Sequence, residues 1–243
     1  MLTLILLGVW SEAGHRIIAN DGGGPRAFVE AFPGVRYTVV RVYEGAVLGL
    51  PLHAARLGVS EERVLRAVRR VGGDLVAIVS DEENDLLCAK SWASSSPLRM
   101  RKPMRVGLRE GRRLAPDVKN TSWAISRRRY EDNSTDETIL CWKGEMLEGL
   151  VSNVCAVFDA TTIVSPKDGV LEGVGLAMAL DAARTLGLRV ERRSLRCEEV
   201  FSAAAAAKAA ATTTELFLTN ANFLVAPVAE IHENPREDGG PPS

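Results

Sequence analysis

Along the first half of the chain, the spacing of hydrophobic residues alternates between strand-like and helix-like periods. The run 1–10 is apolar but too short to span a bilayer and lacks a basic leader, which favours a buried strand. Residues 51–73 carry apolar side chains at helical spacing until a pair of glycines ends the run. The polar, serine-rich stretch 81–96 indicates a loop, and 99–113 alternates basic with apolar residues as a half-exposed strand does. Period-two runs predict further strands at 37–43, 46–50 and 74–80.

The second half alternates helical and strand-like patterns more regularly. Helices are predicted at 122–132, 173–187 and 197–211, the last of them rich in alanine. Strands are predicted at 136–142, in succession over 144–166, and at 188–195, 214–220 and 224–231.

The order of these elements predicts an α/β or α+β fold with two lobes. We expect a smaller N-terminal α/β lobe over 1–112 and a larger, β-rich C-terminal lobe with helices over 113–231. The last residues, 232–243, are rich in proline, glycine and charge and are expected to be disordered.

Composition argues against several classes of function. A formal net charge of −1 gives no general attraction for nucleic acid or acidic membranes, and the basic run 99–113 has no interleaved aromatic residues. Four widely spaced cysteines without a C-x-x-C pair favour buried thiols in a reducing compartment, and the chain has only three histidines. We therefore expect a soluble protein, cytoplasmic or organellar, that binds no nucleic acid, membrane or metal.

Three polar side chains interrupt the apolar run MLEGLVSNV at 146–154. Glu148, Ser152 and Asn153 are costly to bury without partners, so they require a polar network or a ligand. Lys119 precedes a predicted helix near the lobe boundary, and glycines at 173–175 open another helix, which is a ready site for an anion. Each feature alone has an ordinary interpretation as a solvated lysine, a hairpin turn or a strand–helix junction. Their joint order and spacing carry more weight.

Together these segments resemble the class IV (fold type IV) pyridoxal-phosphate aminotransferases. That family includes branched-chain and D-amino acid aminotransferases and 4-amino-4-deoxychorismate lyase. The resemblance runs from about Tyr37 to Ile231 and is strongest from Lys119 onward. It implies the two-lobed fold of the family, a pyridoxal 5'-phosphate cofactor, amino acid and 2-oxo acid substrates, and a homodimer whose sites receive loops from the neighbouring subunit.

The resemblance also implies roles for individual residues. Lys119 would be the catalytic lysine that forms the Schiff base with the cofactor, Glu148 would face its pyridine nitrogen, and Arg56, in the segment HAARL, would grip its phosphate. The substrate would lie near Tyr37 and Arg41. The residues expected to contact the cofactor are Arg56, Lys119, Glu148, Ser152, Asn153, Val174, Gly175, Asn220 and Ala221.

Three functions remain open, and an amino acid aminotransferase is the leading one. The turn Asn220-Ala221 is closer to the lyase version, so elimination of pyruvate from aminodeoxychorismate to give p-aminobenzoate is the first alternative. The second is a catalytically degenerate dimeric homologue. It is suggested by Gly175 and Ala221, which stand where the family usually has hydroxyl residues, and by a chain that ends soon after Ile231, where relatives continue with a further helical segment.

Overall fold

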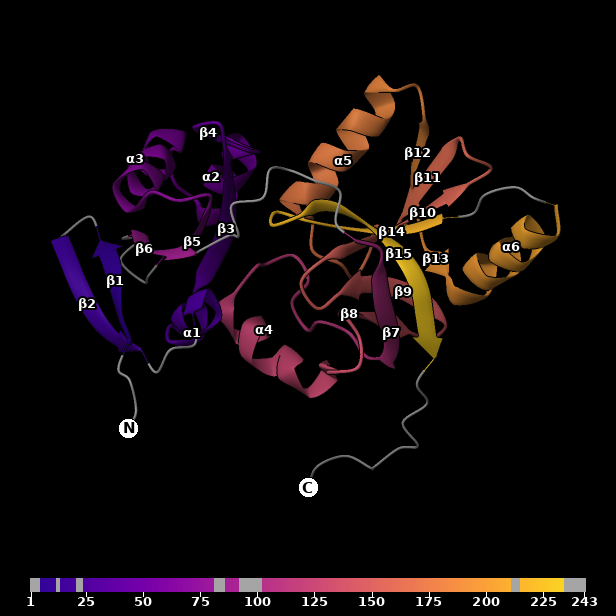
Figure 1. Cartoon of the computed structure of the whole chain (residues 1–243), viewed down its shortest axis with the longest axis horizontal. Helices are drawn as coiled ribbons and strands as arrows, with labels where there is room; N and C mark the ends of the chain where they lie inside the picture. The colour runs from indigo at the N-terminus through magenta and orange to yellow at the C-terminus, as the bar shows by residue number, and fades with distance from the viewer. Residues whose placement is uncertain are drawn as a thin grey trace.

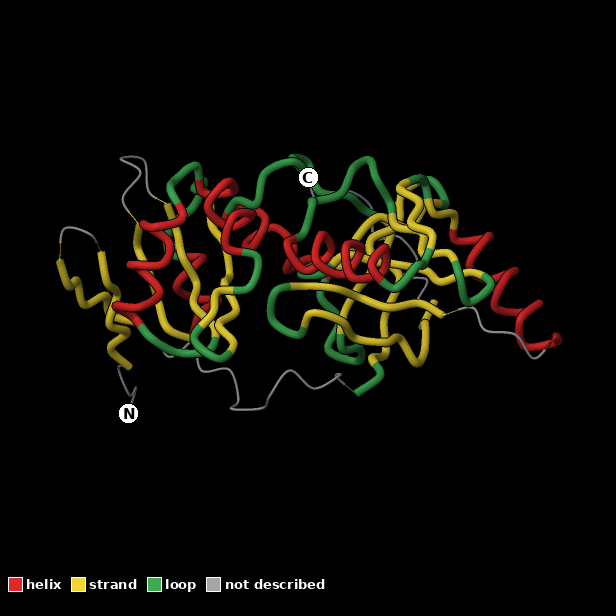
Figure 2. Tube along the Cα trace, turned by 90° about the horizontal axis from the view of Figure 1, so that it is seen from above, coloured by secondary structure: helices red, strands yellow, loops and turns green. Residues whose placement is uncertain are grey.

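The computed structural model of the protein describes residues 5–11, 14–20, 24–80, 86–91, 102–210 and 215–233. Two sheets, each with its own helices, form two bodies that lie side by side along the long axis of the molecule (Figures 1 and 2). This mixture of sheets and helices confirms the predicted α/β or α+β class. Among the helices so described, none has the length and apolar character needed to cross a membrane.

The N-terminal body is a six-stranded antiparallel sheet with the strand order β2-β1-β6-β5-β3-β4. Its strands are β1 (Ile5–Ser11), β2 (Gly14–Asn20), β3 (Arg36–Tyr43), β4 (Ala46–Val47), β5 (Leu75–Ser80) and β6 (Leu86–Ser91). Its helices are α1 (Gly24–Glu30), α2 (Leu50–Leu57) and α3 (Glu61–Val71).

Successive residues of a strand face opposite sides of its sheet, and this alternation sorts the N-terminal core into two layers. Val76 and Ile78 of β5 pack with residues of α2 and α3. Ala77 and Val79 pack on the other face, with α1 and with Tyr37 of β3. The side chain of Tyr37 therefore lies on the face of the sheet that does not carry α2 and α3.

The helix predicted over 51–73 is in fact two helices. Gly58 adopts a left-handed φ of 72° and ends α2, a conformation that glycine takes without the cost a side chain would add. Ser60 then begins α3 by accepting a hydrogen bond from the N–H of Arg63. The single-helix prediction was wrong because the apolar spacing continues across this break, whereas the predicted end at Gly72 is confirmed.

The C-terminal body is a nine-stranded sheet with the order β12-β11-β10-β14-β15-β7-β8-β9-β13. Its strands are β7 (Met104–Glu110), β8 (Glu137–Trp142), β9 (Glu145–Gly149), β10 (Asn153–Phe158), β11 (Thr162–Ser165), β12 (Arg189–Arg192), β13 (Leu195–Arg196), β14 (Glu215–Asn220) and β15 (Leu224–Glu233). Its helices are α4 (Thr121–Ser126), the 3-10 helix η1 (Arg127–Tyr130), α5 (Val174–Thr185) and α6 (Cys197–Ala210), which lies at the end of the molecule opposite β1 and β2 (Figure 1).

One extra strand pair closes part of this sheet into a barrel. Strand β9 pairs with β10 through Glu148 and Asn153, so β10, β14, β15, β7, β8 and β9 form a continuous ring. A closed ring leaves no unpaired edge among these strands. Its interior is filled by apolar residues from every strand, among them Val106, Ile139 and Leu218. The two residues that close the ring are predicted site residues.

A buried carboxylate holds the turn at which the barrel closes. Glu137, at the start of β8, is 7% exposed and accepts backbone N–H groups from Thr138 at 3.0 Å and from Leu150 and Val151 at 3.2 Å each. The hydroxyl of Ser152 donates to the same carboxylate at 2.9 Å. Hydrogen bonds to a charged acceptor are among the stronger ones in proteins, so Glu137 fixes the path of the chain between β9 and β10.

Two predicted elements of the N-terminal body need correction. The strand predicted at 46–50 ends at Val47, because the chain turns there and α2 begins at Leu50. The loop predicted at 81–96 contains β6, whose Leu86 and Cys88 are buried in the core. Its polar flanks hid this strand, and they lie outside the described residues.

The basic run and the chain ends were predicted with partial success. Strand β7 confirms the strand expected within 99–113, and it lies between β15 and β8 in the C-terminal sheet. The division into lobes at residue 112 stays a prediction. Strand β1 confirms a strand near the start of the chain. The predicted tail begins too early, because His232 and Glu233 belong to β15. Residues 1–4, 99–101 and 234–243 lie outside the described part.

We expect Glu137→Gln to lower the free energy of unfolding by about 1–3 kcal/mol, because an amide cannot accept all four of these hydrogen bonds. Urea unfolding at neutral pH measures the change. Glu215→Gln, at an exposed position of β14, is the matched control and should stay within about 0.5 kcal/mol of the parent protein. A Glu137→Gln protein as stable as this control would show that the turn is held by its backbone alone.

Candidate active site

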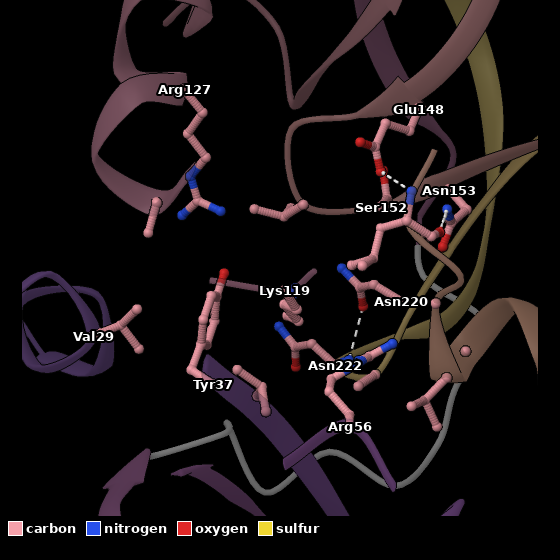
Figure 3. A pocket seen from close by; sticks show the side chains of 18 of the residues that line it. Val29, Tyr37, Arg56, Lys119, Arg127, Glu148, Ser152, Asn153, Asn220 and Asn222 are labelled. Carbon is pink, nitrogen blue, oxygen red and sulfur yellow. Dashed lines mark hydrogen bonds between the residues drawn. The ribbon is translucent and has the colours of Figure 1, made fainter. Parts of the chain in front are cut away.

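A cavity of about 380 Å³ between the two bodies collects the predicted site residues (Figure 3). Those that line it are Tyr37, Arg56, Lys119, Glu148, Ser152, Asn153, Val174, Gly175, Asn220 and Ala221. Arg41 is buried on β3 but does not line the cavity. Because Tyr37 and Arg56 come from the N-terminal body and the others follow β7, neither body forms the site by itself.

Lys119 is fixed where the chain enters α4. Its carbonyl accepts the N–H of Tyr37 at 3.0 Å, and Asn120 caps α4 by accepting the N–H of Trp123 at 3.1 Å. The Nζ atom of Lys119 lies 4.8 Å from the centre of the Tyr37 ring. Burial lowers the pKa of Lys119 well below its usual value, and three nearby arginines lower it further. A lysine in such a place has a neutral, nucleophilic amine at a lower pH than an exposed one.

Glu148 faces an arginine that the sequence analysis did not identify. The side chain of Glu148 is almost fully buried, and its Oε1 lies 3.0 Å from Nε of Arg113. The guanidinium of Arg113 is stacked on the ring of Trp123, 4.7 Å from its centre. Burial raises the pKa of the Glu148 carboxyl, and the charge of Arg113 offsets only part of this effect. Glu148 and Arg113 therefore form an ion pair that is held out of water beside the cavity.

The backbone of Leu171 ties together the two residues that close the barrel. Its N–H donates to Oε2 of Glu148 at 3.2 Å, and its carbonyl accepts from Nδ2 of Asn153 at 2.6 Å. Ser152 donates instead to Glu137. The polar groups that interrupt the apolar run 146–154 thus satisfy one another and the neighbouring backbone, and Glu148 keeps one oxygen toward Arg113 and the cavity.

Donors for an anion gather at another part of the cavity. Helix α5 begins there after Gly173, which makes no side-chain cap, so its first N–H groups are available. Arg56 reaches this place from α2 and donates to the carbonyl of Glu172. Asn220 orders the adjacent turn by accepting the backbone N–H groups of residues 222 and 223. A helix N-terminus beside a guanidinium is a favourable site for a phosphate group.

Gly175 is required by the close approach of two backbones. A Cβ atom at this position would lie 2.6 Å from the backbone carbonyl of Asn220, too close for any neighbouring group to yield cheaply. The glycine therefore lets the first turn of α5 meet the turn after β14. In this chain, the absence of the hydroxyl residue usual at this place follows from packing.

The cavity fits the pyridoxal phosphate that the family resemblance implies. It offers a lysine amine of lowered pKa, a carboxylate near it, and an anion site made of Arg56 and the start of α5. Oε1 of Glu148 lines the cavity with Nε of Arg113 as its ion-pair partner, and a carboxylate oxygen has a second lone pair with which it can accept a hydrogen bond from a ligand. These are the three kinds of group that the cofactor's aldehyde, ring nitrogen and phosphate require.

Sequence reasoning missed two arginines that line this site, the buried Arg113 and the partly buried Arg127. Both lie in basic clusters, RR at 112–113 and RRR at 127–129, which are typical of solvated surface. In each cluster one arginine lines the cavity, Arg113 or Arg127, while its neighbour, Arg112 or Arg128, is exposed. Periodicity does not reveal which one, because the distinction depends on packing between the two bodies.

Comparison with known proteins identifies the family. The sequence model of the family amino-transferase class IV matches residues 67–231, which is more than half of the chain. A search of curated proteins found no match to this chain. A protein assigned as a branched-chain amino acid aminotransferase from Thermotoga maritima is 22% identical, with a TM-score of 0.69 over 94% of this chain and 88% of that one. The branched-chain aminotransferase of Thermoproteus uzoniensis is 18% identical (TM-score 0.67, 93% and 88% covered), and 4-amino-4-deoxychorismate lyase of Pseudomonas aeruginosa is also 18% identical (0.62, 93% and 92%). These likenesses show the shared fold, and the family match shows that the chain belongs to the class IV aminotransferases, a family of pyridoxal-phosphate-dependent enzymes.

Proposed function

We propose that the protein is an aminotransferase that moves an amino group between an amino acid and a 2-oxo acid, with Lys119 as its catalytic lysine. One observation carries this proposal: a single cavity joins the amine of Lys119, the pair Glu148–Arg113 and the anion site at Arg56. The bound cofactor supplies an aldehyde that takes up amino groups and a ring that accepts electrons from the substrate carbon. The residues of this chain supply binding, orientation and proton transfer.

Lys119 is suited to move the proton of the substrate. Its lowered pKa leaves a neutral amine that accepts a proton from the α-carbon and returns it elsewhere. The capped start of α4 and the hydrogen bond from Tyr37 fix the backbone from which this amine extends. Such fixed placement is worth several orders of magnitude in rate for a reaction between two bound groups.

Glu148 and Arg56 hold the two ends of the cofactor in this proposal. A buried carboxylate keeps a proton on a nearby ring nitrogen, and Arg113 prevents Glu148 from turning away. At the other end, the guanidinium of Arg56 and the N–H groups of α5 would bind a phosphate dianion through charge-assisted hydrogen bonds.

The homodimer that the family resemblance implies stays a prediction. Measuring the mass of the protein in solution tests it.

A lyase that releases pyruvate from aminodeoxychorismate is the second candidate. The turn Asn220-Ala221, which lines the cavity without a hydroxyl group, favours it. The two functions differ in product, since a lyase forms p-aminobenzoate and a transaminase converts 2-oxoglutarate to glutamate in the presence of an amino donor. The close fit of Gly175 against Asn220 weakens the third interpretation, a degenerate homologue, because that glycine has a packing role.

The decisive test is whether the cofactor links to Lys119. Protein reconstituted with pyridoxal phosphate should show visible absorbance, and borohydride reduction followed by peptide mapping should place the adduct on Lys119. Lys119→Ala should lose the adduct and turnover, whereas Lys167→Ala, in an exposed loop, should keep both. An adduct on another lysine, or none in folded protein, would remove the proposed catalytic role.

The amine of Lys119 should react at lower pH than the other lysines do. Because burial and nearby arginines lower its pKa, the neutral form is present at a pH where exposed lysines are still protonated. Competitive acylation of the protein without cofactor, read by peptide mass spectrometry from pH 6 to 11, measures each midpoint. A Lys119 midpoint equal to or above that of Lys167 would contradict the expected environment.

Gly175→Thr should impair the site even though it restores the hydroxyl residue usual in the family. The new Cβ would meet the backbone of Asn220, so we expect a loss of about 1–3 kcal/mol in unfolding free energy and weaker cofactor binding, by about tenfold or more. Ala221→Ser, which adds a hydroxyl group on the neighbouring turn, is the matched variant and should bind the cofactor at least as well as the parent. Tighter cofactor binding by Gly175→Thr would favour a degenerate site.

A further inference from the structure

One cation of the cavity has no assigned task in the proposed reaction. Arg113 pairs with Glu148, and Arg56 lies at the anion site. Arg26 also lines the cavity, but it is paired with Glu30 and with a second glutamate at position 131. Arg127, the first residue of η1, lines the same cavity with a side chain that is only 12% exposed.

Arg127 is poorly satisfied by the protein around it. Its Nη1 donates to the carbonyl of Leu150 at 3.5 Å, the upper limit for a hydrogen bond. Its Nε lies 4.0 Å from a carboxylate oxygen of Glu131 and has no hydrogen-bond partner among the described residues. A guanidinium has five N–H donors, so most of its capacity is free for a ligand. By contrast, the adjacent Arg128 is exposed and makes a close ion pair with Glu30.

The guanidinium of Arg127 points into the cavity and toward the hydroxyl of Tyr37 (Figure 3). Both side chains lie away from Asn153 and Asn220, on the side where Val29 enters from α1. Val39 and Ala124 also line the cavity, and they pack in the same apolar cluster as Val29 and Tyr37. The space there is thus bounded by apolar side chains, the phenol of Tyr37 and the guanidinium of Arg127, whereas the guanidinium of Arg26 is already paired with glutamates.

We propose that Arg127 binds a carboxylate of the substrate and thereby selects amino acids and oxo acids over plain amines. This inference rests on the proposed function, because the phosphate and ring sites must be filled by the cofactor for this pocket to receive the substrate. The planar fork of a guanidinium matches the two oxygens of a carboxylate, and a pair formed out of water is strong. The apolar wall suits the carbon chain of the substrate.

The bound carboxylate could come from the α-carbon or from an acidic side chain, and one experiment separates the two. The probes are 4-methylpentanoate and pentanedioate, which carry one and two carboxylates and no amino group. Their binding to the cofactor-loaded protein is measured by calorimetry for the parent, Arg127→Gln, Arg127→Lys and the matched control Arg128→Gln. Cofactor loading is measured separately by absorbance.

Arg127→Gln should bind 4-methylpentanoate about 10- to 100-fold more weakly than the parent, with Arg127→Lys between them and Arg128→Gln within about twofold of the parent. A loss of similar size for both probes assigns the α-carboxylate, whereas a loss for pentanedioate alone assigns a side-chain carboxylate. Parent protein should also prefer 4-methylpentanoate to the neutral 4-methylpentanamide by at least about tenfold, a comparison that needs no variant.

Equal binding of the acid and the amide by the parent would overturn the proposal, and so would equal losses in the Arg127 and Arg128 variants. Failure of the proposed function appears differently, as a folded protein in which no cofactor links to Lys119. If the protein loads the cofactor but Arg127→Gln binds both carboxylate probes as tightly as the parent does, the proposed function stands and the proposed role of Arg127 is wrong.

Discussion

The site depends on one buried carboxylate that does not line the cavity. Glu137 accepts four hydrogen bonds, three of them from the segment where β9 gives way to β10, and this segment closes the barrel. Closing the barrel there sets Glu148 and Asn153 opposite each other, and the backbone of Leu171 then holds both side chains. The carboxylate of Glu148 must stay out of water, charged and directed at a ligand. It needs such support, because an unsupported carboxylate would take up a proton or turn toward water.

The second constraint is that each body of the protein supplies only part of the site. Tyr37 reaches the cavity from β3, and its N–H bonds to Lys119 of the connecting segment. Arg56 crosses from α2 to the carbonyl before α5. These contacts make the position of the catalytic amine depend on how the bodies pack, so a change in their packing moves Lys119 relative to Glu148. The cavity and the interface between the bodies are therefore one structural unit.

Pattern and family resemblance predicted most elements, and nearly all of the predicted site residues line the cavity, because buried strands, glycine turns and a carboxylate in an apolar run leave clear local signals. They failed where the decisive fact was not local. Strand β6 is hidden by its polar flanks, and α2 and α3 share one apolar spacing across Gly58. Arg113 and Arg127 belong to basic clusters whose exposed members look the same in sequence. From the sequence, Gly175 suggests only the loss of a hydroxyl group. The structure shows that a side chain at this position would collide with the backbone of Asn220.

The charges around Lys119 explain how binding and reactivity arise from one arrangement. The described lining residues include four arginines and Lys119 but a single carboxylate, that of Glu148. An excess of positive charge in a cavity between two bodies attracts anionic ligands and, by the same field, favours the neutral form of the lysine. By reciprocity, any anion that binds beside Arg56 or Arg127 weakens this field and raises the affinity of the Lys119 amine for a proton. The arginines that line the cavity therefore set both its affinity for anions and the proton affinity of the Lys119 amine.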